Sequence, residues 1–343
     1  MSQKNNSSLF IALFAILLMA LMFRGLKLFI SQQIKADDFK IYVTEKYNSD
    51  IIIDEISAHD KNAKLLGLKL LLKIRKYDDN VNTGCYTIRK GFSARNISDV
   101  LTSGSQTPVK VVINSTRTVD QMAKMISQQL MLDSTQISNQ LKDSLFLDSI
   151  GYSPATVFSL IIPNTYEFYW NVSSEGFMKR MVKEHDSFWN ESRKGKAAEM
   201  GLTQLEVMTL ASIVEEETVI SNERPIVAGL YMNRLKKNMS LQADPTVIFA
   251  LGGERPKRVL NVHLKIDSPY NTYKHTGLPP APIRFVSTSS IDAVLNYAHH
   301  KYLYMCAKED FSGYHNFSAT LSGHNINAIK YQRALSAANR RKK

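Results

Sequence analysis

An apolar run without a single charge, Leu9 to Phe23, lies near the start of this chain. Such a run is poorly soluble in water, so it belongs in a lipid bilayer, a signal peptide or a protein core. It is slightly short for a membrane span, but Arg24 and Lys27 can extend toward lipid headgroups and lengthen it. No small-residue cleavage pattern follows, which disfavours a cleaved signal peptide. We therefore expect one retained transmembrane helix over residues 9–30, preceded by a polar tail, residues 1–8.

The composition is that of a basic globular protein. The chain has 343 residues, a net charge of +12, and 44% apolar and 22% charged residues, which is too apolar for a disordered protein. The charge favours an anionic partner, such as nucleic acid, anionic lipid or an acidic cell-wall polymer. No base-reading motif or zinc-ligand spacing is present, so no nucleic-acid partner is expected. Cys85 and Cys306 do not make a disulfide framework or a metal site, and we expect free thiols.

Residues 38–107 predict a small α/β domain. Phe39 to Ser57 contains two β-rich apolar runs separated by Asn-Ser-Asp. Apolar residues at helical spacing predict a helix within Asn62–Tyr77. The sequence GCYTI then predicts a strand, followed by a helix from Ser93 to Gly104.

Residues 108–340 predict a larger, mixed α+β domain, so the fold class of the whole chain is α+β. The segment PVKVVINSTRTVDQMAKMISQQL predicts a strand, a turn and a helix. Thr203 and Glu206 have the spacing of a capping box, which predicts a helix from Gln204. NERPIVAGLYMNRLKK predicts a further amphipathic helix, with Pro225 in its first turn, where proline is tolerated.

The helix that begins at Gln204 ends on three consecutive glutamates. Most of its residues are apolar, so we expect it to lie largely inside a domain. Because successive residues point about 100° apart, Glu216 continues the polar stripe and is expected to be solvated, whereas Glu217 continues the apolar stripe. A carboxylic acid beside apolar side chains keeps its proton to higher pH. The pattern favours Glu217 over Glu216 as a proton donor and leaves Glu215 open.

The second half of the chain contains a series of short blocks. In order they are LASIVEEET (Leu210 to Thr218), NER, MNRL, LQADPTVIFALG, SPYNTYKHTGLPPAPI and YLYMCAKEDFSGYHNFSATLSGHN (Tyr302 to Asn325). In order and spacing they resemble the YceG-like family of endolytic murein transglycosylases, over Pro163 to Tyr331. The family pattern ends its helix on Glu-x-Glu-Thr with the second glutamate catalytic, which here is Glu217. The resemblance also implies a cytoplasmic tail, a single span and a LysM-like domain before the catalytic domain.

The resemblance implies the chemistry of a lytic transglycosylase. In the family's reaction, a glutamic acid protonates the oxygen that joins N-acetylmuramic acid to N-acetylglucosamine. Its carboxylate then helps the muramyl C6 hydroxyl to attack the anomeric carbon of the same sugar, and proximity favours this internal attack. The cut strand keeps a 1,6-anhydromuramyl end, and neither a metal nor another cofactor is needed.

Around Glu217 we expect a set of substrate-binding residues: Gln242, Asp244, Tyr270, Asn271, Thr272, Tyr273 and His315. Their amides can bond sugar hydroxyl or acetamido groups, and their tyrosine rings can lie against a sugar. Asp244 is equally compatible with a cap or turn carboxylate before Pro245, and as a second catalytic carboxylate it would make the enzyme a hydrolytic muramidase. A non-catalytic, glycan-binding scaffold is the third hypothesis. Glu223 and Arg224 are expected to form a structural ion pair.

The implied substrate sets the remaining expectations. Peptidoglycan lies outside the cytoplasmic membrane, so we expect the catalytic domain on the extracytoplasmic, periplasmic side. A basic domain near anionic lipid and wall polymers is consistent with that location. The expected partners are peptidoglycan glycan strands, the peptidoglycan synthases (penicillin-binding proteins) and, through the N-terminal helix, the membrane.

Overall fold

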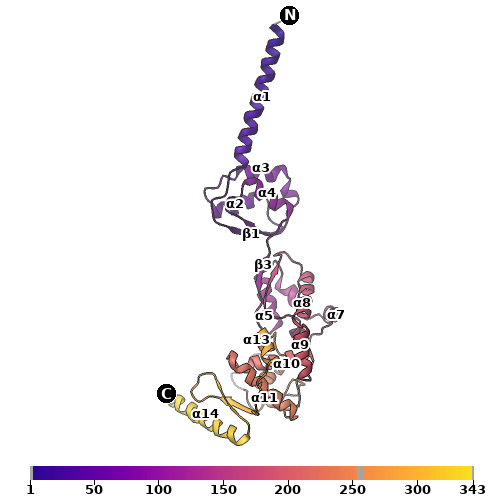
Figure 1. The fold of residues 1–343 in the computed structure, drawn as a ribbon, viewed down its shortest axis with the longest axis vertical. Coiled ribbons are helices and arrows are strands. Elements are labelled where there is room, and N and C mark those ends of the chain that lie inside the picture. Colours follow the sequence, from indigo (N-terminus) through magenta and orange to yellow (C-terminus); the bar gives the residue numbers. More distant parts are fainter. Residues whose placement is uncertain (1–2, 253–255, 257–258, 342–343) are drawn as a thin grey trace. The chain divides into compact units, whose positions relative to one another are not determined.

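The computed structural model describes residues 3–252, 256 and 259–341 (Figure 1). Residues 1–2 of the expected tail, and residues 253–255 and 257–258 of the expected catalytic domain, lie outside the described residues. The chain forms two compact units. Unit 1 is Met1–Lys110 with Glu167–Val172, and unit 2 is Val111–Tyr166 with Ser173–Lys343.

Helix α1, Gln3–Ile30, contains the N-terminal apolar run. Its apolar side chains from Ala12 to Met22 are exposed, among them Phe14 (64% exposed) and Met22 (70%). Across the described part of the chain, no helix combines the length and apolarity that crossing a membrane requires.

The rest of unit 1 is a small α/β fold. Its elements are β1 (Phe39–Val43), α2 (Ser49–His59), α3 (Leu66–Ile74), the 3-10 helix η1 (Tyr77–Asp79), β2 (Gly84–Ile88) and α4 (Ala94–Ser103). Strands β1 and β2 pair antiparallel, with Phe39 opposite Ile88. The predicted helix from Ser93 is confirmed, because Ser93 caps α4 in a capping box and Gly104 ends it with a positive φ of 69°.

One predicted strand of this unit is wrong. The second apolar run of Phe39–Ser57 forms the helix α2 instead. The Asn48 side chain accepts the backbone N–H of Ile51 and so caps the helix, and Ile52 and Ile56 are both buried, one helical turn apart. A short run of isoleucines fits a strand and a buried helix face equally well, and the cap decides between them.

The remaining elements follow in chain order. They are β3 (Val109–Val112), α5 (Val119–Ser127), α6 (Ser134–Gln140), α7 (Ser144–Ser149), η2 (Val157–Ser159), β4 (Thr165–Phe168), α8 (Ser174–Phe188), α9 (Glu191–Glu199), α10 (Gln204–Glu217), η3 (Ser221–Glu223), α11 (Arg224–Lys236), α12 (Asp244–Ala250), η4 (His263–Lys265), α13 (Thr288–Leu295), β5 (Tyr304–Ala307), β6 (His315–Ser318) and α14 (Leu321–Arg341). Strands β3 and β4 form one two-stranded sheet, and β5 and β6 form another. The mixed α+β class is thus confirmed.

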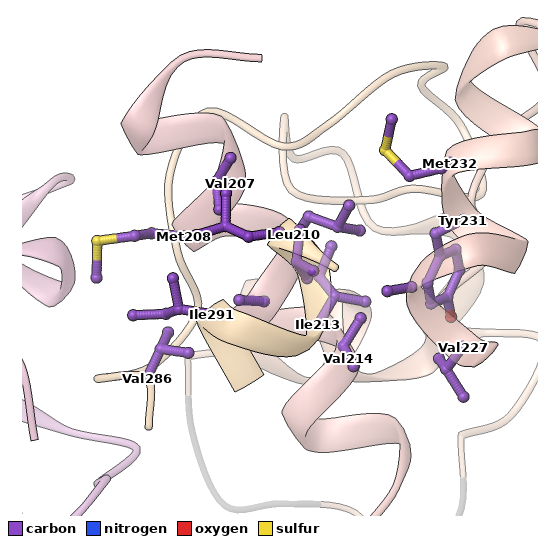
Figure 2. Close-up of a cluster of buried hydrophobic side chains, with 14 of the residues drawn as sticks. Val207, Met208, Leu210, Ile213, Val214, Val227, Tyr231, Met232, Val286 and Ile291 are labelled. Atoms are coloured by element: carbon purple, nitrogen blue, oxygen red, sulfur yellow. The ribbon is translucent and has the colours of Figure 1, made fainter. Parts of the chain in front are cut away.

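Helix α10 lies at the centre of the main core of unit 2. Thr203 and Glu206 make the predicted capping box, and every residue from Val207 to Val214 is buried. Figure 2 shows its apolar side chains together with Val227 and Tyr231 of α11 and Ile291 of α13. A helix that is apolar on almost all sides is stable only inside such a core. The core therefore holds the C-terminal end of α10, and its glutamates, in a fixed position.

Candidate active site

A cavity of about 400 Å³ opens at the C-terminal end of α10. Its lining combines Glu217 with side chains from α11, from the segment Leu241 to Asp244, and from β5, β6 and α14. Five of the predicted site residues line it: Glu217, Gln242, Asp244, Tyr273 and His315. They come from four stretches of sequence, so the fold is what brings them together.

Glu217 is a partly buried carboxyl group with a raised pKa. The Tyr231 hydroxyl donates to its Oε1 at 2.8 Å. Burial raises the pKa of Glu217 from its ordinary value of 4.5 to about 7, and the negative charges of Asp244 and Glu216 act in the same direction. The Tyr231 hydrogen bond and the Arg234 charge oppose the shift without cancelling it. Glu217 is therefore a carboxylic acid that keeps a transferable proton near neutral pH.

The expectation that Glu216 is solvated is wrong. Its side chain is 6% exposed. Arg117 bonds both of its oxygens, at 2.6 and 3.1 Å, and Arg284 Nη1 donates to Oε1 at 2.5 Å. Both arginines lie far from Glu216 in sequence, so periodicity within α10 could not reveal them.

Glu215 lies in an environment that differs from those of Glu216 and Glu217. Its Oε2 accepts the backbone N–H and the hydroxyl of Ser287, both at 2.8 Å. Burial alone would raise its pKa, but hydrogen bonds from Ser115 and Ser287 and the charge of Arg284 lower it overall. Glu215 is therefore an ionised structural anchor and a poor proton donor.

Arg234, which sequence analysis did not single out, organises one wall of the cavity. It is 7% exposed and donates to the carbonyl oxygens of Leu303, Ser240 and Leu241. It also donates to Gln242 Oε1 at 3.3 Å. Gln242 has a φ of 53°, a left-handed conformation that is uncommon for a residue other than glycine. The strained backbone and the arginine together fix Gln242 at the cavity wall.

Asp244 and Tyr273 form a second pair on the cavity wall. Asp244 is the first residue of α12, and the Tyr273 hydroxyl donates to its Oδ1 at 2.6 Å. Burial and the hydrogen bond to Asp244 raise the pKa of Tyr273. Asp244 thus begins α12, where its side chain makes no capping hydrogen bond to a described residue, and also lines the cavity, so its part in substrate binding stays a prediction.

Tyr270, Asn271 and Thr272 are not among the cavity-lining residues. Asn271 is fully buried and donates to the carbonyls of Leu264 and Ile266. Thr272 Oγ1 accepts the backbone N–H of Ala243, and Thr272 O accepts that of Gln242. The Tyr270 ring packs against Phe249. These side chains shape the loops that present Gln242, Asp244 and Tyr273.

His315 pairs with a buried carboxylate. The His315 ring Nδ1 lies 2.9 Å from Glu223 Oε2, and its backbone N–H donates to Glu223 Oε1 at 2.8 Å. Arg224 instead donates to the Ser289 hydroxyl, so the expected Glu223–Arg224 ion pair is wrong. Glu223 is the last residue of the short helix η3. Its side chain points to His315 of β6, which is remote in sequence.

His324 also lines the cavity, and its ring stacks on Tyr304 at 5.5 Å between centroids. Burial lowers its pKa, so it is neutral near pH 7. His324 belongs to the sequence block SGHN, but only the tertiary structure shows that it lines the cavity. Among the residues that the structure describes, no three His, Cys, Asp or Glu side chains are grouped to hold a metal ion. Cys85 and Cys306 are free thiols.

The site thus combines one carboxylic acid that keeps its proton to near neutral pH, Glu217, with a second carboxyl group, Asp244, in the same cavity. A family model described as YceG-like matches residues 41–330, which is most of the chain. The chain belongs to the YceG-like family. Its YceG-like region contains Glu217 and every other residue that lines the cavity.

Relatives and a solved structure agree with this assignment. An endolytic murein transglycosylase of Bacillus subtilis is 34% identical over 264 residues, covering 72% of this chain and 72% of that protein. One from Streptococcus pneumoniae is 27% identical over 305 residues, covering 78% of this chain and 54% of the relative. A crystal structure of a YceG-like protein from Listeria monocytogenes superposes with a TM-score of 0.57 at 28% identity, covering 84% of this chain and 98% of that one.

Proposed function

We propose that this chain is a lytic transglycosylase that cleaves peptidoglycan strands between N-acetylmuramic acid and N-acetylglucosamine. The observation that carries the proposal is Glu217, whose pKa is raised to about 7 in a cavity lined by hydrogen-bonding side chains. Such a group can protonate the bridging oxygen at neutral pH. The C6 hydroxyl of the muramyl residue then attacks the anomeric carbon of the same sugar and gives its proton to the Glu217 carboxylate, so a 1,6-anhydro end remains and the acid is restored. The names of the curated relatives support this reaction class.

The substrate-binding roles follow from the cavity wall. Gln242, Asp244 and Tyr273 present an amide, a carboxylate and a phenol to the cavity. These groups suit the hydroxyl and acetamido groups of the two sugars, and the tyrosine ring suits a sugar face. Asn271, Thr272 and Tyr270 support this wall from behind it.

The test is mass spectrometry of the products released from purified glycan strands by the full chain. We expect 1,6-anhydromuramyl ends, and their loss in the Glu217→Gln variant, which keeps the side-chain shape but cannot donate an acidic proton. Glu175→Gln is the matched control, since Glu175 lies on the surface of α8 and its side chain is 67% exposed. It should retain full activity.

Asp244 favours one alternative function. Its carboxylate lines the same cavity as Glu217, and two carboxyl groups are what a glycoside hydrolase requires. Reducing muramyl ends in the product would make the protein a muramidase and assign Asp244 as base or nucleophile. If strands bound but neither protein cut them, the chain would be a non-catalytic glycan-binding scaffold.

We further propose that α1 anchors the protein in the cytoplasmic membrane, with the cavity on the extracytoplasmic side. The support is the uncharged run Leu9 to Phe23 and the exposed apolar side chains of α1, which have no protein core to cover them. Full-length protein should sediment with membranes, and a chain that starts at residue 31 should not. Recovery of both in the soluble fraction would contradict the anchor.

Two finer assignments belong to the same proposal. The β1–α2–α3–β2 order of unit 1, with β1 and β2 antiparallel, supports a LysM-like domain over residues 38–107 that binds glycan or sets a distance from the membrane. Penicillin-binding synthases are proposed partners, because an enzyme that cuts new strands acts where they are made. Cross-linking in intact cells, followed by detection of penicillin-labelled proteins, tests that association.

A further inference from the structure

Strand β5 borders the cavity along its whole length. Every residue of the strand, from Tyr304 to Ala307, lines the cavity together with Glu217. Successive side chains of a strand point to opposite faces of its sheet. A cavity that touches consecutive residues of a strand therefore reaches both faces, which it can do only around an edge. Because β6 pairs with one edge of β5, the cavity lies at the other, which we call the outer edge.

Both faces of the β5–β6 sheet are covered, so the outer edge is the part of β5 that a ligand can reach. On one face, the Tyr304 ring stacks on His324 of α14. On the other face, Met305 packs against the main core of unit 2. All residues of β5 are half-buried, without the alternation of a strand that covers a core with one face only.

The hydrogen-bond register shows which backbone groups lie at the outer edge. Ala307 lies opposite His315 in the register, and the next residue, Lys308, donates its backbone N–H to Tyr314 O at 2.9 Å. Bonded and non-bonded pairs alternate along an antiparallel ladder. The backbone N–H and C=O groups of Met305 and Ala307 therefore point away from β6. Among the described residues, none is hydrogen-bonded to these groups.

The matching edge of β6 is closed in a different way. The backbone N–H of His315 points away from β5, and it donates to Glu223 Oε1 at 2.8 Å. The outer edge of β5 has no such partner within the described part of the chain and faces the cavity instead. Unpaired groups of this kind readily pair with an added extended peptide.

The substrate contains a peptide of the required kind. In peptidoglycan, the lactyl group of N-acetylmuramic acid carries a short peptide, so the sugar that Glu217 would act on has a peptide attached to it. An extended peptide presents N–H and C=O groups on one side at every second residue, which is the spacing of Met305 and Ala307. Sugar hydroxyl groups have no such regular alternation of donors and acceptors.

We propose that the outer edge of β5 binds the peptide of the muramyl residue as a short added strand, beside the bond that Glu217 cleaves. This inference rests on the proposed transglycosylase function and specifies its substrate as strands that still carry their peptides. The peptide holds the muramyl sugar at Glu217 before and during the reaction. Its binding therefore acts mainly on KM, and strands that have lost their peptides are poor substrates.

The first test compares two substrates of the full chain: peptide-bearing glycan strands, and the same strands after an amidase has removed their peptides. We expect kcat/KM to be about 10-fold higher for the peptide-bearing strands, mainly through KM, because backbone hydrogen bonds are gained. Ala307→Pro removes one N–H of the outer edge, and proline is tolerated at a strand edge. It should reduce the ratio of the two kcat/KM values to about twofold or less. Ala307→Ser keeps the amide and should keep the preference.

The second test measures binding without cleavage. In the Glu217→Gln variant of the full chain, hydrogen exchange followed by NMR reports on each amide. Peptide-bearing strands should slow the exchange of the Met305 and Ala307 amides about 10-fold, and stripped strands should not. The amides of Tyr304 and Cys306, which face β6, serve as the internal reference.

The outcomes are separable. Equal kcat/KM of the wild type for the two substrates would overturn the proposal, as would a preference that Ala307→Pro keeps in full. Equal protection of the two amides by stripped strands would show that the edge binds sugar. Should Ala307→Pro fail to fold, the wild-type ratio and the exchange of Glu217→Gln still decide. Reducing ends, or no cleavage of either substrate, would contradict the proposed function, while the exchange measurement still decides on the peptide.

Discussion

Residue by residue, the end of α10 shows how three identical side chains acquire three chemical roles. Glu215 accepts hydrogen bonds from Ser287, Glu216 is held between two arginines, and Glu217 contacts Tyr231 at the cavity. The helical rotation of about 100° per residue sends each carboxylate to a different neighbour. Burial raises the pKa of Glu217 to about 7, whereas hydrogen bonds and the Arg284 charge lower that of Glu215, so the surroundings favour Glu217 as the proton donor.

The raised pKa of Glu217 predicts the pH dependence of the activity. Only the protonated form donates, so kcat should fall about tenfold per pH unit above about pH 7. Rates of anhydro-end formation measured from pH 5 to pH 9 check this expectation. A rate that stays constant to pH 9 would contradict it.

Tyr231→Phe tests the hydrogen bond that opposes this shift. The hydroxyl at 2.8 Å stabilises the ionised form of Glu217 and so lowers its pKa. Its removal should raise the pKa further and move the alkaline fall of kcat to higher pH, while the ring still fills the core. Tyr297→Phe, at a partly exposed ring outside the cavity lining, should leave the profile unchanged.

Sequence periodicity predicted Glu217 but misassigned Glu216. The apolar stripe is a local property of α10, so it could be read from residues 204–217. The partners of Glu216 are Arg117 and Arg284, which lie 99 and 68 residues away. The same holds for Glu223 and His315, which are 92 residues apart. Tertiary contacts of this kind could not be predicted from the sequence.

Among the elements, α10 is fixed at both ends, by a capping box at Thr203 and by the two arginines at Glu216. Glu216→Gln should lower the free energy of unfolding by roughly 1.5–3 kcal/mol, because the buried Arg284 guanidinium loses one of its two carboxylate partners and keeps Glu215 at 3.4 Å. Urea denaturation gives the value. Glu191→Gln removes an exposed ion pair and should cost less than about 1 kcal/mol. Equal costs for the two variants would argue against the structural role of Glu216.

Helix α11 packs unusually closely against the segment that follows α13. A Cβ added at Gly229 would lie 2.1 Å from the Ala298 carbonyl oxygen, which is backbone and cannot move aside. Gly229→Ala should therefore destabilise the protein by about 1–3 kcal/mol. Gly195→Ala, on α9 with no heavy atom within 4 Å of the added Cβ, should instead be neutral or stabilise by about 0.5–1 kcal/mol. Thermal unfolding of both variants makes the comparison.

Element boundaries with clear caps were predictable, as at Thr203 for α10 and Ser93 for α4. The failure at α2 came from a run, Ile51 to Ile53, that carries no periodicity of its own. For the loops after α11, the sequence predicted a set of candidate substrate-binding residues but did not show which of them line the cavity. Asn271 and Tyr273 are two residues apart in sequence. The Asn271 side chain is buried and hydrogen-bonds to backbone carbonyls, whereas Tyr273 lines the cavity.

For the whole molecule, unit 1 includes six residues from much later in the chain, Glu167–Val172. Asn171 donates to the carbonyl and the hydroxyl of Thr83, and the Trp170 ring contacts Tyr42. The expected boundary at residues 107–108 stays a prediction, and the contacts divide the chain at Lys110 instead. We call Glu167–Val172 the returning segment. Sequence patterns did not predict that it packs in unit 1, because its contacts there are with residues far away in the sequence.

Residues 31–110 alone should therefore be less stable than the same residues within the full chain, by about 1–3 kcal/mol. Hydrogen exchange of the β1 and β2 amides measures the difference. Asn171→Ala in the full chain removes only the two hydrogen bonds to Thr83 and should reproduce part of the loss. Identical exchange in fragment and full chain would show that the returning segment contributes nothing.

The returning segment also limits how a gene for such a protein can be rearranged. The chain passes between the two units after residues 110, 166 and 172, so no single junction separates them. A recombination that replaced residues 1–110 with an unrelated module would leave the side chains of Trp170 and Asn171 without their partners Tyr42 and Thr83. Insertions before Gln33 separate none of these contacts, whereas Gln33 and Ile34 are already bonded to the rest of unit 1. Exchange of parts among relatives is therefore expected to be frequent ahead of residue 33 and rare between β2 and β3.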